Sequence, residues 1–279
     1  MKYGLFGFHR GDDLTALARL ARQTEEAGYE SIWVGEHVVM PHPDIQKTPM
    51  APDEPRLDPI VALTWVAAHT QRVKLGTGVI VLPHRQPLIL SRQIASLDLL
   101  SNGRLIFGIG VGWLQPEIEA VGGSYVERGA QSDEYLAAME TIWSGEYCSF
   151  KGKWVSWDRM IAVPPPAQLP RPPITVGGHT KPAYRRALTK AEGWYGFGLD
   201  VEATARCLEG LRETAQEVDR PASLGDLEIT ITPPAGPLDR DTAKRYEDLG
   251  VHRLAVLRPQ GGSAVTERFI WDFADGLIR

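Results

Sequence analysis

Short apolar segments alternate along the chain with longer segments in which apolar residues recur every three or four positions. Short β-branched and apolar runs are typical of buried strands, and the longer period is typical of amphipathic helices. The pattern predicts eight strands, at residues 3–8, 31–35, 73–83, 104–110, 174–176, 193–198, 227–232 and 253–257, with helices after them. Strands that alternate with helices in this order indicate an α/β protein with a (β/α)8 TIM barrel.

Start and stop signals define the helices and one insertion. Asp12 or Asp13 is the expected N-cap of a helix that ends at Ala27. Further helices are expected at residues 59–70, 87–100, 132–143, 181–191, 201–218, 239–249 and 265–277. Residues 147–161 predict a hairpin inserted before the fifth strand, and the proline-rich stretch 163–173 predicts a rigid connector. We expect residues 1–279 to form a single domain.

Composition narrows the class of protein. The chain of 279 residues has 43% hydrophobic and 23% charged residues, as an ordinary globular enzyme has. A net charge of −5 without a basic run argues against nucleic-acid binding. The two cysteines form no disulfide framework, and no run is long enough for a signal peptide or a membrane span. We therefore expect a cytoplasmic protein that acts on a small molecule.

Glycines interrupt the third predicted strand. Gly76, Thr77 and Gly78 stand in the middle of an apolar β-branched run that continues with Val79 and ends at Pro83. A glycine pair in a strand marks a bulge or a place where a flat group lies against the backbone. The alternative is a strand thinned where a helix packs close to it.

The carboxyl ends of the other strands carry candidate chemistry, because TIM-barrel active sites lie at that end. Strand two ends in Glu36 and His37, and a histidine there can pass a proton in either direction, although a rim histidine can also simply bond a loop. Strand four ends in Gly110, Val111, Gly112 and Trp113. The two glycines would leave room for a planar ring, and Trp113 would form one wall of the pocket around it. A buried packing tryptophan is the alternative.

Two later segments complete the candidate site. Gly177, Gly178, His179 and Thr180 precede a helix, where backbone N–H groups and the helix dipole favour a phosphate; Thr180 as a plain N-cap is the alternative. Glu117 and Arg128 follow strand four, and they either reach the pocket at the carboxyl ends of the strands or form a solvent-exposed ion pair. Phe8 and His9 follow strand one and are expected in the substrate pocket. A metal-dependent hydrolase that uses His9, His37, His84 and His179 is a competing hypothesis, as is a non-catalytic flavin binder.

With these residues in place, the chain resembles the luciferase-like monooxygenase superfamily, in its flavin- and F420-dependent oxidoreductase branch. The resemblance covers most of residues 1–200 and rests on these matching segments, in order: 33–37, 75–83, 104–113 with Glu117 and Gly122, 127–129 before 134–136, and 176–178 with 193–194. It implies a cofactor ring over strands three and four, a non-prolyl cis peptide at Gly78–Val79, and a phosphate loop at Gly177–Gly178.

The resemblance also implies roles and partners. Glu36 and His37 match the acidic-histidine pair beside the reactive ring, with His37 as the proton carrier. The implied cofactor is coenzyme F420, with FMN as the alternative, and the implied assembly is a homodimer. Two positions depart from close relatives: Val111 stands where bacterial luciferases have a phosphate-binding arginine, and Trp113 where sugar-phosphate dehydrogenases have a glutamate. These departures argue against luciferase chemistry and against glucose-6-phosphate oxidation.

Overall fold

The strands form where the apolar runs predict them. The computed structural model describes residues 1–11 and 13–279. The strands are β1 (Lys2–Phe6), β2 (Ser31–Val34), β3 (Lys74–Thr77), β4 (Ile80–Val81), β5 (Leu105–Gly110), β8 (Ile174–Gly177), β9 (Gly193–Phe197), β10 (Glu228–Thr232) and β11 (Arg253–Leu257). The third predicted strand is divided into β3 and β4, because the chain turns out of the ladder at Gly78, whose N–H donates to the Val34 carbonyl at 2.6 Å.

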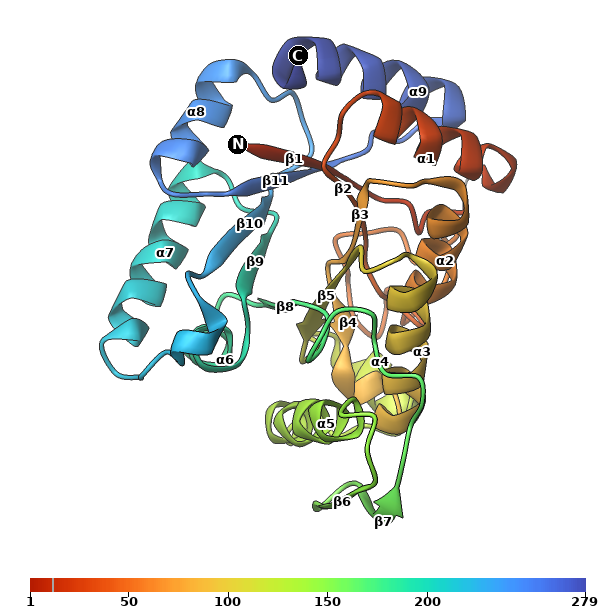
Figure 1. Cartoon of the computed structure of the whole chain (residues 1–279). Coiled ribbons are helices and arrows are strands. Elements are labelled where there is room, and N and C mark those ends of the chain that lie inside the picture. The colour runs from red at the N-terminus through yellow and green to blue at the C-terminus, as the bar shows by residue number, and fades with distance from the viewer. Residues whose placement is uncertain (12) are drawn as a thin grey trace.

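Parallel pairing closes these strands into a barrel (Figure 1). Neighbours follow the order β3-β2-β1-β11-β10-β9-β8-β5-β4, and a further pairing of β3 with β5 joins the two ends of the sheet. β3 and β4 both pair with β5 and together fill the third position of the barrel. This arrangement confirms the predicted (β/α)8 barrel.

Helices follow the strands and surround them. They are α1 (Leu17–Glu26), α2 (Pro59–His69), α3 (Pro87–Leu100), α4 (Gln115–Ala120), α5 (Arg128–Ile142), α6 (Lys181–Lys190), α7 (Val201–Ala215), α8 (Arg240–Asp248) and α9 (Gly262–Phe273), with 3-10 turns η1 (Leu14–Ala16), η2 (Leu82–His84) and η3 (Ala222–Leu224), and a π turn at Ala274–Ile278. Asp13 caps η1 by accepting from the Ala16 N–H; Asp12, the other predicted cap, lies outside the described residues. Within the described residues, no helix has the length and apolar character needed to cross a membrane.

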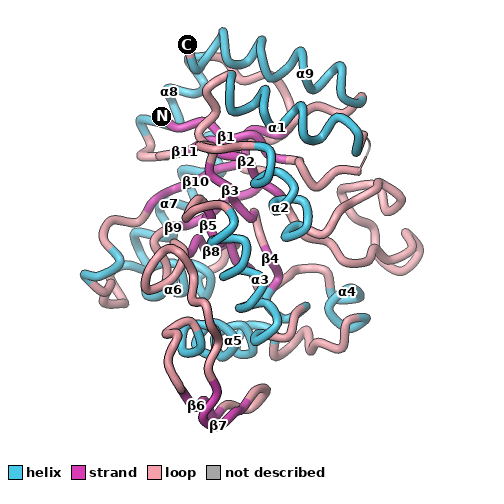
Figure 2. The backbone as a smooth tube through the Cα atoms, turned by 45° about the vertical axis from the view of Figure 1, so that its right-hand side comes forward, coloured by secondary structure: helices cyan, strands magenta, loops and turns pink. Residues whose placement is uncertain are grey.

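The predicted insertion before the fifth strand is an antiparallel hairpin. Its strands are β6 (Cys148–Lys151) and β7 (Ser156–Met160), and it extends from the barrel beyond α5 (Figures 1 and 2). The Glu134 carboxylate on α5 accepts the backbone N–H groups of Lys153, Trp154 and Val155 in the hairpin turn, at 2.7, 2.7 and 2.9 Å. That helix begins at Arg128, four residues before the predicted start at Ser132.

The interior of the barrel has its own small aromatic core. Trp33 and Tyr195 stack with ring centroids 5.6 Å apart and an interplanar angle of 2°. A Cβ on Gly76 would lie 2.4 Å from the Trp33 ring, so Gly76 is a glycine because the indole occupies the space above it. The large Trp33 side chain on β2 thus packs where Gly76 on β3 has no side chain, which keeps the interior closely packed.

Arginines close the end of the barrel at which the strands begin. Arg253, 1% exposed, donates to both oxygens of Glu30, at 2.8 and 2.9 Å, and to the hydroxyl of Thr230 at 3.0 Å. Arg104 donates to the carbonyls of Ala67, Thr70, Val73 and Ser101, which end α2 and α3 and precede β3. The Arg104 guanidinium thus satisfies carbonyls that the ends of α2 and α3 leave unpaired.

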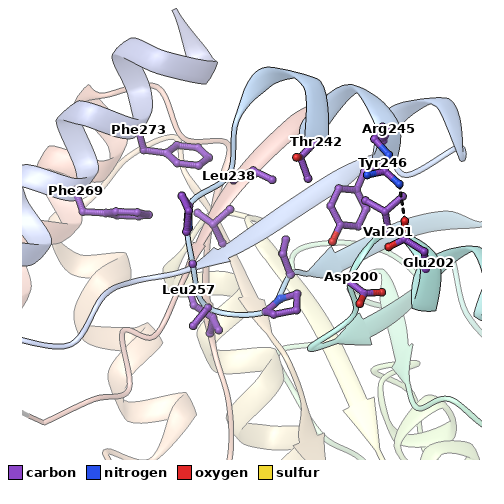
Figure 3. A pocket seen from close by; sticks show the side chains of 16 residues that line it. Asp200, Val201, Glu202, Leu238, Thr242, Arg245, Tyr246, Leu257, Phe269 and Phe273 are labelled. Carbon is purple, nitrogen blue, oxygen red and sulfur yellow. Dashed lines mark hydrogen bonds and ion pairs between the residues drawn. The ribbon is translucent and has the colours of Figure 1, made fainter.

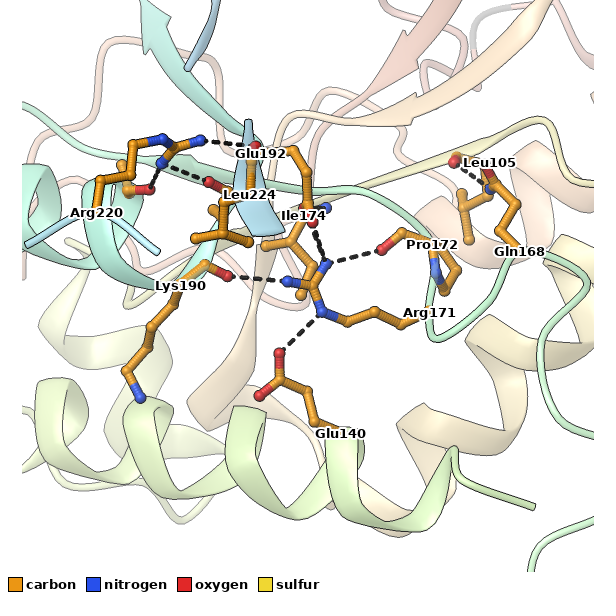
Figure 4. Close-up of polar contacts among 12 residues, drawn as sticks. Leu105, Glu140, Gln168, Arg171, Pro172, Ile174, Lys190, Glu192, Arg220 and Leu224 are labelled. Atoms are coloured by element: carbon orange, nitrogen blue, oxygen red, sulfur yellow. Dashed lines mark hydrogen bonds and ion pairs between the residues drawn. The ribbon is translucent and has the colours of Figure 1, made fainter. Parts of the chain in front are cut away.

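A third arginine joins further elements at the same end (Figure 4). Arg171 donates to Glu140 on α5 at 2.9 Å, to both oxygens of Glu192 at 3.0 and 2.8 Å, and to the Lys190 carbonyl at 3.2 Å. Glu192 also accepts the Ile174 N–H at 2.7 Å, where β8 begins. The proline-rich connector is thereby fixed to the strand that it leads into.

Candidate active site at the carboxyl ends of the strands

His37 and Glu117 form a hydrogen-bonded pair at the opposite end of the barrel. His37 follows β2 and Glu117 lies in the first turn of α4, and the His37 Nδ1 is 2.9 Å from Glu117 Oε2. Since an ionised carboxylate only accepts hydrogen bonds, Nδ1 donates the proton of this bond, which leaves Nε2 as the ring nitrogen that can exchange a proton. The imidazole is 15% exposed and meets the Trp113 ring edge to face at 6.1 Å.

Glu117 is fixed by backbone as well as by His37. Its Oε1 accepts the Val38 N–H at 2.5 Å, and the side chain is 2% exposed. Burial by itself would raise the pKa of this carboxyl, but His37 and the Val38 N–H outweigh burial and hold the pKa below its usual value. The alternative of a solvated Glu117 is therefore wrong. The sequence did contain a signal: Leu114, Glu117 and Ile118 share one helical face, and both apolar members are buried.

Glu36 is an anchor rather than a member of the open site. Its side chain is 1% exposed, and Oε2 accepts the Val81 N–H at 2.6 Å. Oε1 accepts the Arg85 Nε at 2.6 Å, and Arg85 also reaches Asp58 at 2.6 Å. Burial raises the pKa of Glu36 in spite of Arg85. These contacts hold β4 and the loop after β2 in place, and the catalytic role of Glu36 stays a prediction.

The glycines at the carboxyl ends accommodate Val79. The peptide bond Gly78–Val79 is cis, as the family resemblance implied. A Cβ on Gly110 would lie 2.6 Å from one Val79 methyl, and a Cβ on Gly177 would lie 2.8 Å from the other. Trp33 likewise fills the space over Gly76. The expectation that a flat group would rest on bare backbone at these glycines is therefore wrong. Val79, which is partly exposed, is the side chain presented there.

Thr77 connects two strands instead of facing the site. Its hydroxyl donates to the Gly108 carbonyl at 2.8 Å and accepts the Gly108 N–H at 2.7 Å, and the residue is 0% exposed. A Cβ on Gly108 would be only 1.7 Å from the Thr77 carbonyl oxygen. The predicted contact of Thr77 with a cofactor is corrected accordingly: its side chain replaces ladder bonds next to the bulge.

The segment after β5 forms one wall of the site. Val111 and Gly112 are partly exposed, and Trp113 is 46% exposed, so the alternative of a buried packing tryptophan is wrong. Gly112 has a φ of +82°, which favours glycine, and its carbonyl accepts from Arg128 Nε at 3.0 Å. Arg128 also lies 3.7 Å over the Tyr125 ring, so this arginine holds the segment's shape.

The predicted phosphate loop lies at the start of α6. Gly178 has a φ of +127°, and its carbonyl accepts from Trp194 Nε1 at 2.8 Å. His179 Nε2 accepts the Phe197 N–H at 3.3 Å, which ties the loop to the end of β9. Thr180 occupies the N-cap position, but its side chain makes no capping hydrogen bond. Its hydroxyl is exposed beside the first turn of the helix.

The two residues after β1 that were predicted in the substrate pocket, Phe8 and His9, lie in different surroundings. Phe8 is 0% exposed and belongs to the main core between barrel and helices, so its placement in a substrate pocket is wrong. His9 is partly exposed, and its Nδ1 accepts the Gly35 N–H at 3.1 Å. Burial, followed by the charges of Arg10 and Arg56, lowers the pKa of His9 to about 3. His9 is thus a neutral imidazole beside the strand that carries His37.

A cavity of about 330 Å³ lies elsewhere, beneath the loop between β10 and α8 (Figure 3). Its walls come from that loop, from Tyr246 on α8, from Val256 and Leu257 on β11, and from Phe269 and Phe273 on α9. None of the predicted site residues lines it. The candidate site is therefore assigned from the His37–Glu117 pair and not from this cavity.

The hypothesis of a metal-dependent hydrolase requires about three side chains that converge on one metal ion. Among residues 1–11 and 13–279, no group of three or more His, Cys, Asp or Glu side chains is placed to hold a metal ion. The histidines near the strand ends are instead bonded separately, His9 to Gly35, His37 to Glu117 and His179 to Phe197.

Comparison with known proteins agrees with this arrangement. The family model for luciferase-like monooxygenases matches residues 1–257. An uncharacterised protein of Mycobacterium tuberculosis is 34% identical over 213 residues, 72% of this chain and 74% of that protein. The oxygenase component of the flavin-dependent trigonelline monooxygenase of Acinetobacter baylyi is 31% identical over 167 residues, 59% of this chain and 42% of that protein.

Solved structures show the same fold. An F420-dependent secondary alcohol dehydrogenase, solved with an F420-acetone adduct, superposes with a TM-score of 0.81 at 14% identity, covering 99% of this chain and 98% of that one. A family model that spans nearly the whole chain, a relative above 30% identity and a common barrel all lead to one assignment. The chain belongs to the luciferase-like monooxygenase family and is an oxidoreductase of that family.

Proposed function

We propose that the protein is an F420-dependent oxidoreductase in which His37 exchanges a proton with a small organic substrate. The observation that carries this proposal is the His37–Glu117 pair, with Nδ1 and Oε2 2.9 Å apart, at the carboxyl ends of the barrel strands. When bound, the deazaflavin supplies a carbon centre that accepts or donates a hydride. Transfer of a hydride to or from a hydroxyl-bearing carbon must be matched by a proton, and His37 is the group placed to carry it.

Glu117 sets the state of His37 for this role. It fixes the proton on Nδ1 and stabilises the imidazolium that forms when Nε2 accepts a second proton. Glu117 is itself held by the Val38 N–H, so the pair is positioned before a substrate arrives. The partly exposed His37 and the exposed Trp113 would bound the substrate side of the site.

The residues present fit a long planar cofactor with an anionic tail. Val79, backed by Gly110 and Gly177, is the side chain that would meet the ring, and Val111 and Gly112 would border it. The start of α6, from Gly178 to Thr180, would hold the phosphate, because a helix N-terminus without a side-chain cap has N–H groups to donate. The tail and the ring would thus lie along β8 and β5, which pair directly.

FMN is the second candidate cofactor, favoured by the 31% identity to the flavin-dependent trigonelline monooxygenase component. Both cofactors share a tricyclic ring and a phosphate, so the same residues would serve either. The proposal also includes a cytoplasmic homodimer, which light scattering of the purified protein tests.

Fluorescence titration of the purified protein with F420 and, separately, with FMN tests the proposal. We expect saturable quenching with F420 at a lower concentration than with FMN. Preferential binding of FMN would transfer the assignment to the second candidate. If neither cofactor binds at micromolar concentrations, the cofactor assignment fails, while tight binding without reduction by any donor would indicate a non-catalytic binder.

A further inference from the structure

The cavity beneath the loop between β10 and α8 lies at the same end of the barrel as the candidate site. Among the residues that line it, Asp200 follows β9, Pro233 follows β10, and Leu257 is the last residue of β11. The carboxyl ends of parallel barrel strands all lie at one end of the barrel. The cavity therefore shares this end with the His37–Glu117 pair.

Leu257 belongs both to the wall of the cavity and to the interior of the barrel. Its partly buried side chain lines the cavity. The same side chain packs against the core inside the barrel that contains Phe6, Trp33 and Tyr195, and Val79 packs against that core as well. Leu257 thus joins the cavity to the group of side chains on which the cofactor ring is proposed to rest.

Aromatic rings form two sides of the cavity. Phe269 and Phe273 on α9 lie on one side, and Tyr246 on α8 lies on the other (Figure 3). The Tyr246 hydroxyl donates to the Leu199 carbonyl at 2.8 Å, so its proton is used within the protein. Prolines, leucines and valines make up most of the remaining lining. The walls therefore suit an apolar ring.

The charged side chains of the cavity argue against an anionic ligand. Arg245 and Glu202 are both exposed and pair with each other at 2.5 Å. Asp200 caps α7 by accepting the Ala203 N–H at 2.7 Å, and its second oxygen adds a further negative charge. Two carboxylates thus face one guanidinium, which disfavours a negatively charged molecule.

The volume of the cavity sets the size of a ligand. The cavity holds about 330 Å³, and a dry apolar cavity of about 150 Å³ already binds benzene. It therefore has room for one substituted ring or for two fused rings. The loop above it contains Pro233, Pro234 and Pro237, and each proline fixes its own φ. These prolines limit the conformations in which the loop could collapse into the space.

We propose that this cavity binds an uncharged molecule with one or two apolar rings, and that this ring system is the apolar part of the substrate. Such a ring would lie between the aromatic side chains of α8 and α9, and Leu257 would lie between it and the interior of the barrel. The identification of the ligand as substrate rests on the proposed function. The binding of the ring itself needs no cofactor.

Methyl NMR of the cofactor-free protein tests the binding, with benzyl alcohol as the probe and benzoate as its anionic match. Benzyl alcohol is expected to shift the methyl signals of Leu238, Val256 and Leu257 saturably at millimolar concentrations. Benzoate is expected to bind about tenfold more weakly or less, because its carboxylate would lose hydration. No saturable shift at these methyls, or equal binding of the two probes, overturns the proposal.

Two variants that fill the cavity sharpen this test. Leu238→Phe and Thr242→Leu each add volume to the lining, and each is expected to raise the Kd of benzyl alcohol by about tenfold. The control is Val265→Phe, since Val265 is 44% exposed on α9 and does not line the cavity. Circular dichroism identifies the variants that are folded. A wild-type Kd in a folded filling variant overturns the proposal.

Turnover of cyclic ketones by the cofactor-loaded enzyme tests the link to the substrate. In this reduction a hydride passes from the reduced cofactor to the carbonyl carbon and a proton to its oxygen, so an alcohol and oxidised cofactor result. Leu238→Phe is expected to raise KM for cyclooctanone by about tenfold and to leave KM for cyclopentanone and kcat near the wild-type values. Equal KM values in wild type and variant overturn the substrate assignment. Binding of benzyl alcohol without turnover of any ketone would contradict the proposed function and confirm the binding site.

Discussion

The two ends of the barrel use charged residues in opposite ways. At the end where the strands begin, Arg253 donates to both oxygens of Glu30, and Arg171 donates to Glu192 and to the Lys190 carbonyl. At the end where the strands finish, His37 keeps one ring nitrogen available, and His84 is buried without a protein partner among the described residues. Charged groups whose hydrogen bonds are all made within the protein stabilise the fold, whereas polar groups with a free donor or acceptor can bind a ligand or exchange a proton. The predictions below test this contrast, from the largest expected effect to the smallest.

Removal of the His37 imidazole should have the largest effect on the catalytic end. His37→Ala is expected to lower kcat by about 10²–10⁴-fold, the usual contribution of a positioned general acid or base. The cofactor Kd should change little, whereas the thermal unfolding midpoint should fall, because the buried Glu117 carboxylate loses its His37 partner. Steady-state kinetics and fluorescence titration measure both. Turnover equal to the wild type would show that another group carries the proton.

Removal of Arg253 should have the largest effect on the stabilising end. Arg253→Met leaves the Glu30 carboxylate without its bidentate donor, and breaking a buried pair from one side costs about 3–5 kcal/mol. Urea unfolding measures the loss, and activity per folded molecule should stay constant. The matched control is Arg212→Ala, whose exposed partner Glu209 makes a pair of little value. Equal stabilities of the two variants would contradict the contrast between the ends.

Two glycine substitutions should separate stability from turnover. Gly76→Ala places a methyl 2.4 Å from the buried Trp33 ring and should cost about 1–3 kcal/mol through overpacking. Gly110→Ala places one 2.6 Å from a methyl of the partly exposed Val79, which can turn away, so stability should fall less while cofactor affinity falls more. Gly276→Ala, with nothing within 4 Å, is the control. The opposite ranking would place the functional surface at Gly76.

The dependence of stability on pH should come from His9 at the catalytic end. Its folded pKa of about 3 lies below the ordinary 6.5, so the unfolded state binds more protons between these values. Stability from this group is complete above pH 6.5 and is lost as the pH falls towards 3. His9→Gln, which keeps an acceptor for the Gly35 N–H and does not titrate, should flatten the decline in urea midpoint between pH 7 and 4. An equally steep decline would assign it to other groups.

Local patterns in the sequence determined the fold and the end of the barrel at which the candidate site lies. Apolar runs predicted the barrel strands, and proline and glycine predicted their ends, because each depends on residues near in the chain. Helix α3 and strand β11 begin and end where they were predicted. The Glu36-His37 segment was found at the correct end of the barrel because every strand of this fold points the same way.

Tertiary structure decided which side chains meet. Glu36 and His37 are adjacent in sequence, yet one is a buried anchor for Arg85 and the other pairs with Glu117, 80 residues away. In the sequence, the glycines of β3 and β5 could leave space either for a ligand or for another side chain. The packed barrel shows that Trp33 and Val79 fill that space. Local spacing fixes the conformation of the backbone, whereas burial, partners and therefore pKa depend on contacts between distant segments, which spacing does not encode.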